Sequence, residues 1–143
     1  MGLKDCIMSV KVFYELWQME CCGTPFKLGD SIDWLDMPAK GIKLSEVIEG
    51  LDYYYEAHSD DWENIFVLKG RVEEISIFYE KYELVEGEPH NMMVPVPDIN
   101  ENVKTDSSHI DEKERGDLKA AGYIVEICDT TVRPARKEEV TFC

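Results

Sequence analysis

The chain has 143 residues and a formal net charge of −15, with 44% hydrophobic and 31% charged residues. This length and composition predict one globular domain and argue against a disordered chain. Binding to nucleic acid relies on phosphate neutralisation by Lys and Arg, and anionic membranes attract basic segments. The acidic balance therefore argues against both as partners.

Nothing in the sequence predicts a membrane span or a secreted protein. No apolar run approaches the roughly 20 residues that a span requires. The apolar run at residues 7–10 is interrupted by Lys11 and is too short for the core of a signal peptide. We therefore expect a cytoplasmic protein whose thiols stay reduced.

Residues 7–16 predict the first strand, because apolar side chains alternate along it. The set that shares one face is Met8, Val10, Val12 and Tyr14. The next apolar set begins at Trp17 and is shifted in phase, so a bulge or a short turn is expected between Tyr14 and Trp17.

Residues 17–34 predict a hairpin around which the rest of the fold is built. Its reversal is expected at residues 22–25, where Gly23 permits a positive φ and Pro25 favours a turn. On each arm, alternate residues form one apolar face. These residues are Trp17, Met19, Cys21, Phe26, Leu28, Ile32 and Trp34. Two apolar rows joined by a turn predict a core hairpin rather than an active site.

The same stretch carries a resemblance to a family. The run Trp-Gln-Met-Glu-Cys-Cys-Gly-Thr-Pro-Phe at residues 17–26, followed by Gly29-Asp30, resembles the N-terminal signature of a family of small uncharacterised bacterial proteins. The resemblance is specific over residues 17–34 and looser at Gly70-Arg71-Val72. It implies a small bacterial cytoplasmic protein and assigns no catalytic residue.

Residues 45–57 predict a helix, with Ser45 at its N-cap and acidic residues in its first turns. Its apolar residues recur at helical spacing. They are Leu44, Val47, Ile48, Leu51, Tyr54 and Tyr55. A strand is the alternative for the second half, because Leu51, Tyr53, Tyr55 and Ala57 also alternate and Gly50 weakens the helix.

The second half of the chain predicts further strands and one long loop. Residues 64–85 read as strand around Lys69-Gly70-Arg71, and the buried face changes midway through Glu73-Glu74. Residues 86–120 predict a long loop rich in proline and asparagine, in which residues 110–115 form a short helix or an unstructured link. Residues 123–132 predict the last strand.

Together these elements predict a mainly β fold: a small, partly open β-barrel or roll, SH3-like or OB-like, with one short helix. The predicted domain spans residues 1–133, and residues 134–143 form a C-terminal tail. Such barrels host many functions, so the fold does not decide the activity.

The cysteines predict no zinc site, because Cys6, Cys21, Cys22, Cys128 and Cys143 contain no Cys-x-x-Cys pair. We predict no metal and no cofactor. The alternative is a thiol- or metal-dependent site on Cys22 and His58. Cys22 lies at the predicted turn, and His58 follows the predicted helix in a polar loop.

The leading hypothesis is a non-enzymatic interaction module. No calcium loop, phosphate cradle, nucleophile elbow or metalloprotease motif is present. Aromatic residues are numerous, and Tyr54 and Trp62 are expected to be partly exposed within an acidic surface, as in protein-binding patches. The predicted partner is another protein or a second copy of the chain.

Overall fold

The computed structural model describes residues 9–21, 23–42, 44–57, 61–85, 92–108 and 116–140. The described elements, in chain order, are β1 (Val10–Glu15), α1 (Leu16–Cys21), β2 (Ser31–Pro38), α2 (Leu44–Val47), β3 (Tyr53–Tyr55), a 3-10 helix (Trp62–Asn64), β4 (Phe66–Val85), β5 (Met92–Thr105), β6 (Leu118–Pro134) and a second 3-10 helix (Lys137–Glu139). The prediction of a mainly β fold is confirmed. The short helices α1 and α2 replace the single helix that was expected.

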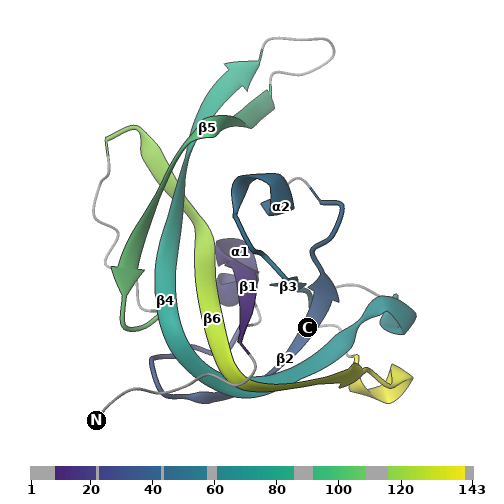
Figure 1. The fold of residues 1–143 in the computed structure, drawn as a ribbon. Helices are drawn as coiled ribbons and strands as arrows, with labels where there is room; N and C mark the ends of the chain where they lie inside the picture. Colours follow the sequence, from purple (N-terminus) through teal and green to yellow (C-terminus); the bar gives the residue numbers. More distant parts are fainter. Residues whose placement is uncertain are drawn as a thin grey trace.

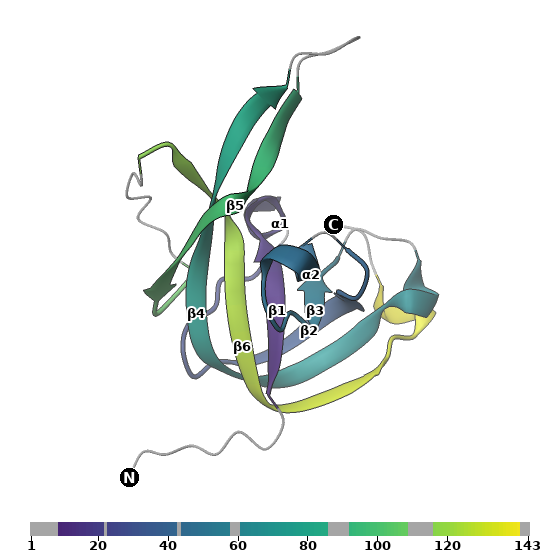
Figure 2. The ribbon, with the colours of Figure 1, turned by 45° about the horizontal axis from the view of Figure 1, so that its top comes forward.

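Five strands close into a ring. The sheet has the order β2-β3-β1-β6-β4-β5, and β2 also pairs with β4, so β1, β6, β4, β2 and β3 follow one another around a closed path. The sixth strand, β5, extends the sheet beyond the ring along the outer half of β4. Figures 1 and 2 both show this part of β4 and β5 reaching away from the ring.

The ring closes because β4 is long and strongly bent. Its first part pairs with β2, its second part with β5, and nearly all of it with β6. Glu73 is the extra residue of a bulge, since Val72 pairs with Ile127 and Glu74 with Glu126. This bulge accounts for the change of phase that the sequence predicts at Glu73-Glu74.

Strands β4 and β6 bend together beside Gly70. Lys69 pairs with Thr131 and Arg71 with Cys128, so two residues of β6 oppose Gly70 alone. One of these two, Asp129, has φ 54°, a left-handed conformation that asparagine and aspartate tolerate better than most residues. A Cβ atom at Gly70 would lie 2.8 Å from the carbonyl oxygen of Cys128 and even closer to Ile127.

Inward-facing side chains from the strands fill the ring. Its core contains Val12, Tyr14, Phe26, Ile32, Trp34, Leu68, Val72, Ile75, Ile77, Tyr79, Tyr123, Val125 and Ile127. A second, smaller cluster lies on the outer face of the sheet, where Phe13, Phe78 and Ile124 pack against Ile48, the residue that follows α2. The predicted alternation of β2, with Ile32 and Trp34 inward, is confirmed.

The first arm of the expected hairpin is wrong, because residues 16–21 form helix α1. Leu16 and Met19, three residues apart, pack on the core of the ring, while Trp17 is 49% exposed. Gly23 donates its N–H to the carbonyl of Gln18 (2.9 Å) and so ends the helix. Leu28, which was expected to face inward, is 43% exposed.

The predicted helix over residues 45–57 is also largely wrong. Helix α2 covers only Leu44–Val47, and Tyr53–Tyr55 forms β3, the strand that was the alternative. Gly50 has φ +75°, which interrupts a helix. Strand β3 then pairs in parallel with β1 and antiparallel with β2, so tertiary pairing decides its conformation.

The loop predicted for residues 86–120 contains a strand, since Met92–Thr105 pairs with β4. Residues 110–115 lie outside the described residues. In the expected tail, Ala135 is buried at 5% exposure and its N–H donates to the carbonyl of Ile65. Among the described residues, no helix combines the length and hydropathy needed to span a bilayer.

One polar side chain inside the ring has no partner. Asp36 shares the inward face of β2 with Ile32 and Trp34 and is 0% exposed. Neither of its carboxyl oxygens has a hydrogen-bond partner. Burial raises the pKa of Asp36 well above the ordinary value, because the charged form loses its hydration.

Asp36 is expected to make the fold less stable as the pH rises. Its pKa is higher in the folded than in the unfolded chain. The free energy of unfolding is therefore highest below the unfolded pKa of ~3.9 and falls by about 1.4 kcal/mol per pH unit until the folded pKa is reached. Urea denaturation across this range should show the stability of Asp36→Asn rising relative to the parent with pH. The exposed control Asp117→Asn should not show this trend, and parallel curves for Asp36→Asn and the parent would contradict it.

Gly70→Ala is expected to lower the free energy of unfolding by about 1–3 kcal/mol or more, because the new methyl group meets backbone and a buried side chain. Gly29→Ala is the control, since nothing lies within 4 Å of its Cβ position and only the strain of φ +87° applies. That strain costs about 1 kcal/mol. Thermal or urea denaturation compares the two variants. A smaller loss of unfolding free energy for Gly70→Ala than for Gly29→Ala would contradict the close approach of β6 to Gly70.

Candidate functional site

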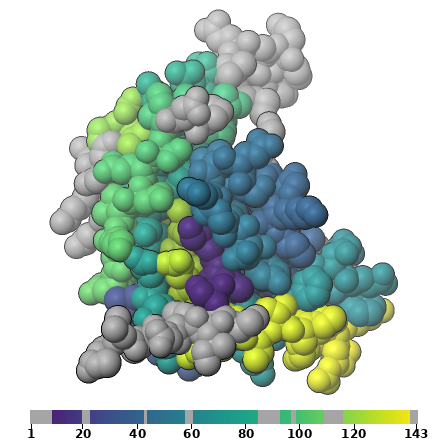
Figure 3. Space-filling model, in the orientation of Figure 1, coloured from purple at the N-terminus to yellow at the C-terminus, as the bar shows by residue number. Residues whose placement is uncertain are grey.

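A cleft lies on the outer face of the sheet, between strands β1, β6, β4 and β5 and the α2 segment, which comprises α2 and the residues after it up to Asp52. Its volume is about 370 Å³. In Figure 3 it is the hollow between the blue α2 segment and the green β5. The lining residues are Lys11, Val47, Ile48, Glu49, Glu74, Ser76, Phe78, Asn100, Asn102, Ile124 and Glu126.

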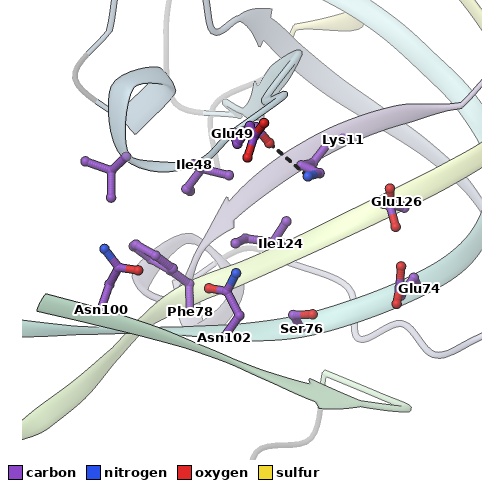
Figure 4. A pocket seen from close by; sticks show the side chains of 11 residues that line it. Lys11, Ile48, Glu49, Glu74, Ser76, Phe78, Asn100, Asn102, Ile124 and Glu126 are labelled. Atoms are coloured by element: carbon purple, nitrogen blue, oxygen red, sulfur yellow. Dashed lines mark hydrogen bonds between the residues drawn. The ribbon is translucent and has the colours of Figure 1, made fainter. Parts of the chain in front are cut away.

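Apolar side chains pack beneath the cleft. Phe78 of β4 and Ile124 of β6 face outward from the ring and pack against Ile48 (Figure 4). Phe78 meets Phe13 of β1 edge to face, with ring centroids 6.0 Å apart. This packing attaches the α2 segment to the sheet and buries all three side chains, so the surface open to the cleft is mainly polar.

A row of four charged side chains crosses the sheet at one end of the cleft. Lys11 of β1 pairs with Glu126 of β6, which pairs in turn with Glu74 of β4. Lys104 of β5 forms an ion pair with Glu74. The order across the four strands is therefore positive, negative, negative, positive, with the two carboxyl groups side by side.

The two carboxyl groups influence each other's titration. The interaction with Glu126 and with the ammonium group of Lys104 lowers the pKa of Glu74. The interaction with Glu74, burial and the charge of Glu74 raise the pKa of Glu126. As the pH falls, Glu126 therefore takes up a proton before Glu74 does, and it can then donate a hydrogen bond to Glu74.

Lys11 positions the wall of the cleft as well as the charged row. Its ammonium group donates to the carbonyl of Glu49 (2.9 Å) and its backbone N–H donates to the carboxylate of Asp52 (2.9 Å). The N–H of Asp52 donates back to the carbonyl of Lys11 (2.9 Å). The segment after α2 is thereby held against β1, and Figure 4 shows the contact with Glu49.

The opposite wall presents neutral polar groups. Asn100 and Asn102 lie on β5 and Ser76 lies on β4, and all three line the cleft (Figure 4). Side-chain amides and hydroxyls can both donate and accept hydrogen bonds. The cleft thus combines hydrogen-bonding walls and a pair of carboxyl groups above a packed layer of apolar side chains.

Of the four residues predicted from the sequence, the two that the structure describes, Tyr54 and Trp62, do not line this cleft. Tyr54 is half-buried beside the apolar cluster under the cleft, and its hydroxyl donates to Sδ of Met37 (3.4 Å). Trp62 is half-buried and begins the first 3-10 helix. Cys22 and His58 lie outside the described residues, so the site proposed on them stays a prediction.

The described residues contain no group of three or more His, Cys, Asp or Glu side chains that could hold a metal ion. Cys128 is buried at 1% exposure and is disulfide-bonded. This differs from the expectation that the thiols are reduced. The polar groups of the cleft include its carboxyl pair, the amides of Asn100 and Asn102 and the hydroxyl of Ser76.

The fold and cleft define a small, mainly β protein in which five strands close into a ring beside an external cleft. A model of a family of unknown function, DUF6578, matches residues 8–129, and the chain belongs to this family. No curated protein and no solved structure matches the chain. The expectation of a family without an assigned activity is confirmed at this level.

Sequence reasoning missed the cleft because its residues are ordinary in sequence. Glu74 stands among many carboxylates, and only the register of β4 on β6 brings it beside Glu126. Lys11, Ser76 and Asn102 each occupy the outward positions of a strand, which is the one signal that the sequence contained. Alternation predicts their face and says nothing of their neighbours.

Glu126→Gln is expected to leave a single titration at the pair. In the parent protein one carboxyl should titrate above the ordinary glutamate pKa of about 4.3 and the other below it. In the variant only Glu74 remains, below the ordinary value. Side-chain ¹³C NMR of the glutamates measures both. The control Glu83→Gln should retain both titration steps of the pair. If the two carboxyl groups of the parent titrated together near about 4.3, the interaction between Glu74 and Glu126 would be ruled out.

Proposed function

We propose that this protein is a non-enzymatic binding module whose cleft receives a lysine or arginine side chain of a protein partner. The observation that carries the proposal is the carboxyl pair Glu74–Glu126, which lines one end of the cleft. A cation that enters beside the pair compensates the charge of both carboxyl groups.

The charge of the cleft supports a basic ligand. Its lining contains three acidic residues, Glu49, Glu74 and Glu126, and one basic residue, Lys11. Lys104 lies beside the lining and forms an ion pair with Glu74, so three carboxylates face two ammonium groups. The ammonium group of Lys11 is already bonded to the carbonyl of Glu49. The net charge of −15 over the whole chain also favours the approach of a basic partner.

The shape of the cleft supports a long basic side chain in particular. Lysine and arginine bury an aliphatic stem on apolar surface and keep the charged end in a polar setting. Val47, which lines the cleft and is half-buried, offers apolar surface for part of the stem. The amides of Asn100 and Asn102 line the opposite wall, where the backbone of a partner segment would pass.

Self-association is the second form that the predicted partnership takes. Leu84 and Met93 pair across β4 and β5 on the part of the sheet that reaches away from the ring (Figure 2), and they are 54% and 56% exposed. Exposed apolar pairs of this kind favour contact with another chain. Sedimentation at high concentration should give a larger mass for the parent than for Leu84→Ser if this pair mediates self-association.

The cytoplasmic location, the bacterial origin and the lack of catalytic activity remain part of the proposal and rest on the sequence. The disulfide of Cys128 bears against the location, since disulfides form mainly in oxidising compartments. The absence of the common catalytic motifs supports the lack of activity.

The proposal is tested by adding short lysine- and arginine-containing peptides to the full chain and measuring their binding by NMR. Amide shifts are expected at Ser76, Asn102 and Ile124, and the double variant Glu74→Gln/Glu126→Gln should weaken binding on the order of tenfold, since two charges are removed. Glu83→Gln/Glu138→Gln, which removes the same charge elsewhere, should bind like the parent. Equal weakening in both double variants would mean that only the overall charge matters, and the proposal would fail.

A further inference from the structure

Asp36 lies at the point where β2 changes its partner strand. Its neighbours in the sheet are Phe66 of β4 on one edge and Tyr55 of β3 on the other. Up to Asp36, β2 pairs with β4 along Ser31–Asp36, and from there it pairs with β3 along Asp36–Pro38. The residue that connects both neighbours of β2 is therefore a fully buried carboxyl whose two oxygens have no hydrogen-bond partner among the described residues.

The neighbours of Asp36 supply no positive charge. The charge of Asp36 raises the pKa of Tyr14 on β1 and of Tyr53 on β3, so both phenol groups lie near the carboxyl. Phe66 of β4 is apolar, and its ring centroid lies 6.5 Å from that of Tyr53. Burial is the cause of the raised pKa of Asp36, and no basic residue in the described ranges lowers it.

Other polar groups around this site do not compensate a carboxylate either. Asp52, which precedes Tyr53 in the chain, carries a second negative charge and also raises the pKa of Tyr53. From α1, the neutral side chain of Gln18 donates to the carbonyl of Tyr55 (3.0 Å). An ionised Asp36 therefore meets phenols, a like charge and apolar rings, and it is stabilised only by reaching water.

Strand β3 is the part of the ring with the shortest pairings. It has three residues, which pair with β2 along Asp36–Pro38 and with β1 at Val12 and Phe13. The other pairings around the ring, β1–β6, β6–β4 and β4–β2, each extend over six residues or more. Local opening takes place where few interactions are lost, so separation of β2 from β3 is the least costly way to expose Asp36.

Two backbone hydrogen bonds mark the ends of the β2–β3 pairing. The N–H of Glu56 donates to the carbonyl of Leu35 (2.9 Å), and the N–H of Ala39 donates to the carbonyl of Asp52 (3.0 Å). Both bonds break when the two strands separate. Strand β3 then stays attached to α1 through Gln18, whose bonds do not involve β2.

We propose that ionisation of Asp36 separates β3 from β2 and opens the ring at this point. The protein then has a closed form in acid and an open form whose population grows as the pH rises. The carboxylate reaches water while β2 stays paired with β4 and β3 stays on β1. The opening is independent of the ligand proposed for the cleft, because no residue of β2 or β3 lines the cleft.

The direction of the pKa shift sets the pH range of the opening. In the open form Asp36 is hydrated and has the ordinary aspartate pKa of ~3.9, whereas in the closed form its pKa is well above that value. The closed form is therefore fully stable below ~3.9. Above this pH the ratio of open to closed form rises about tenfold per pH unit until the pKa of the closed form is reached.

Amide hydrogen exchange of the full chain, measured by NMR, locates the opening. After correction for the intrinsic exchange rate, protection of the Glu56 and Ala39 amides should fall about tenfold per pH unit from about pH 5 upward. Both amides should also exchange through an opening that costs less than global unfolding, as measured by urea denaturation at the same pH. Protection that is independent of pH, or that equals the free energy of global unfolding, would overturn the proposal.

Variants of β2 assign the effect to Asp36. In Asp36→Asn, which keeps the shape of the side chain without its charge, protection of Glu56 and Ala39 should no longer change with pH. Asp36→Leu serves the same comparison if the asparagine variant does not fold. The matched control is Asp33→Asn on the exposed face of the same strand, which should retain the pH dependence of the parent. The parental slope in Asp36→Asn would assign the opening to another group and overturn the proposal.

Discussion

The whole structure depends on the sharing of one strand, β4, among three partners. A strand has two hydrogen-bonding edges, and β4 gives one of them to β6 along nearly its whole length. The other edge is divided between β2, which closes the ring, and β5, which extends the sheet. This division is compatible with a single strand only because bulges at Gly70 and Glu73 turn its direction between the two uses.

The cleft is a consequence of this arrangement. The sheet continues past the ring, and the cleft lies on its outer face between the α2 segment and strands β1, β6, β4 and β5. On the other side, β3 has three residues and β2 has eight. Strand β2 pairs with β4 along Ser31–Asp36 and with β3 only along Asp36–Pro38, so within the described ranges one edge of Ser31–Trp34 has no strand partner.

Burial inside the ring is not uniformly apolar. Gln18 is a buried polar residue with 0% exposure. Its side-chain amide donates to the carbonyl of Tyr55, and its side-chain oxygen accepts from the N–H of Ala57. These bonds connect α1 to the end of β3. Asp36 has no such partners. The contrast shows which buried polar group the fold satisfies and which it leaves for a proton or a ligand.

Alternation along the chain was sufficient to predict the mainly β class, the inward faces of β1 and β2, the bend near Glu73 and the last strand, because a period of two is a local property. It was insufficient for α1, β3 and β5, whose sequences permit more than one conformation. Leu16 and Met19 favour a helix because this conformation packs both side chains on the core of the ring. Tyr53–Tyr55 forms a strand because it pairs with β1 on one side and with β2 on the other. Charge and strand faces were thus determined by the sequence alone. The meeting of Glu74 with Glu126 was decided by strand register, which arises only when distant segments pair.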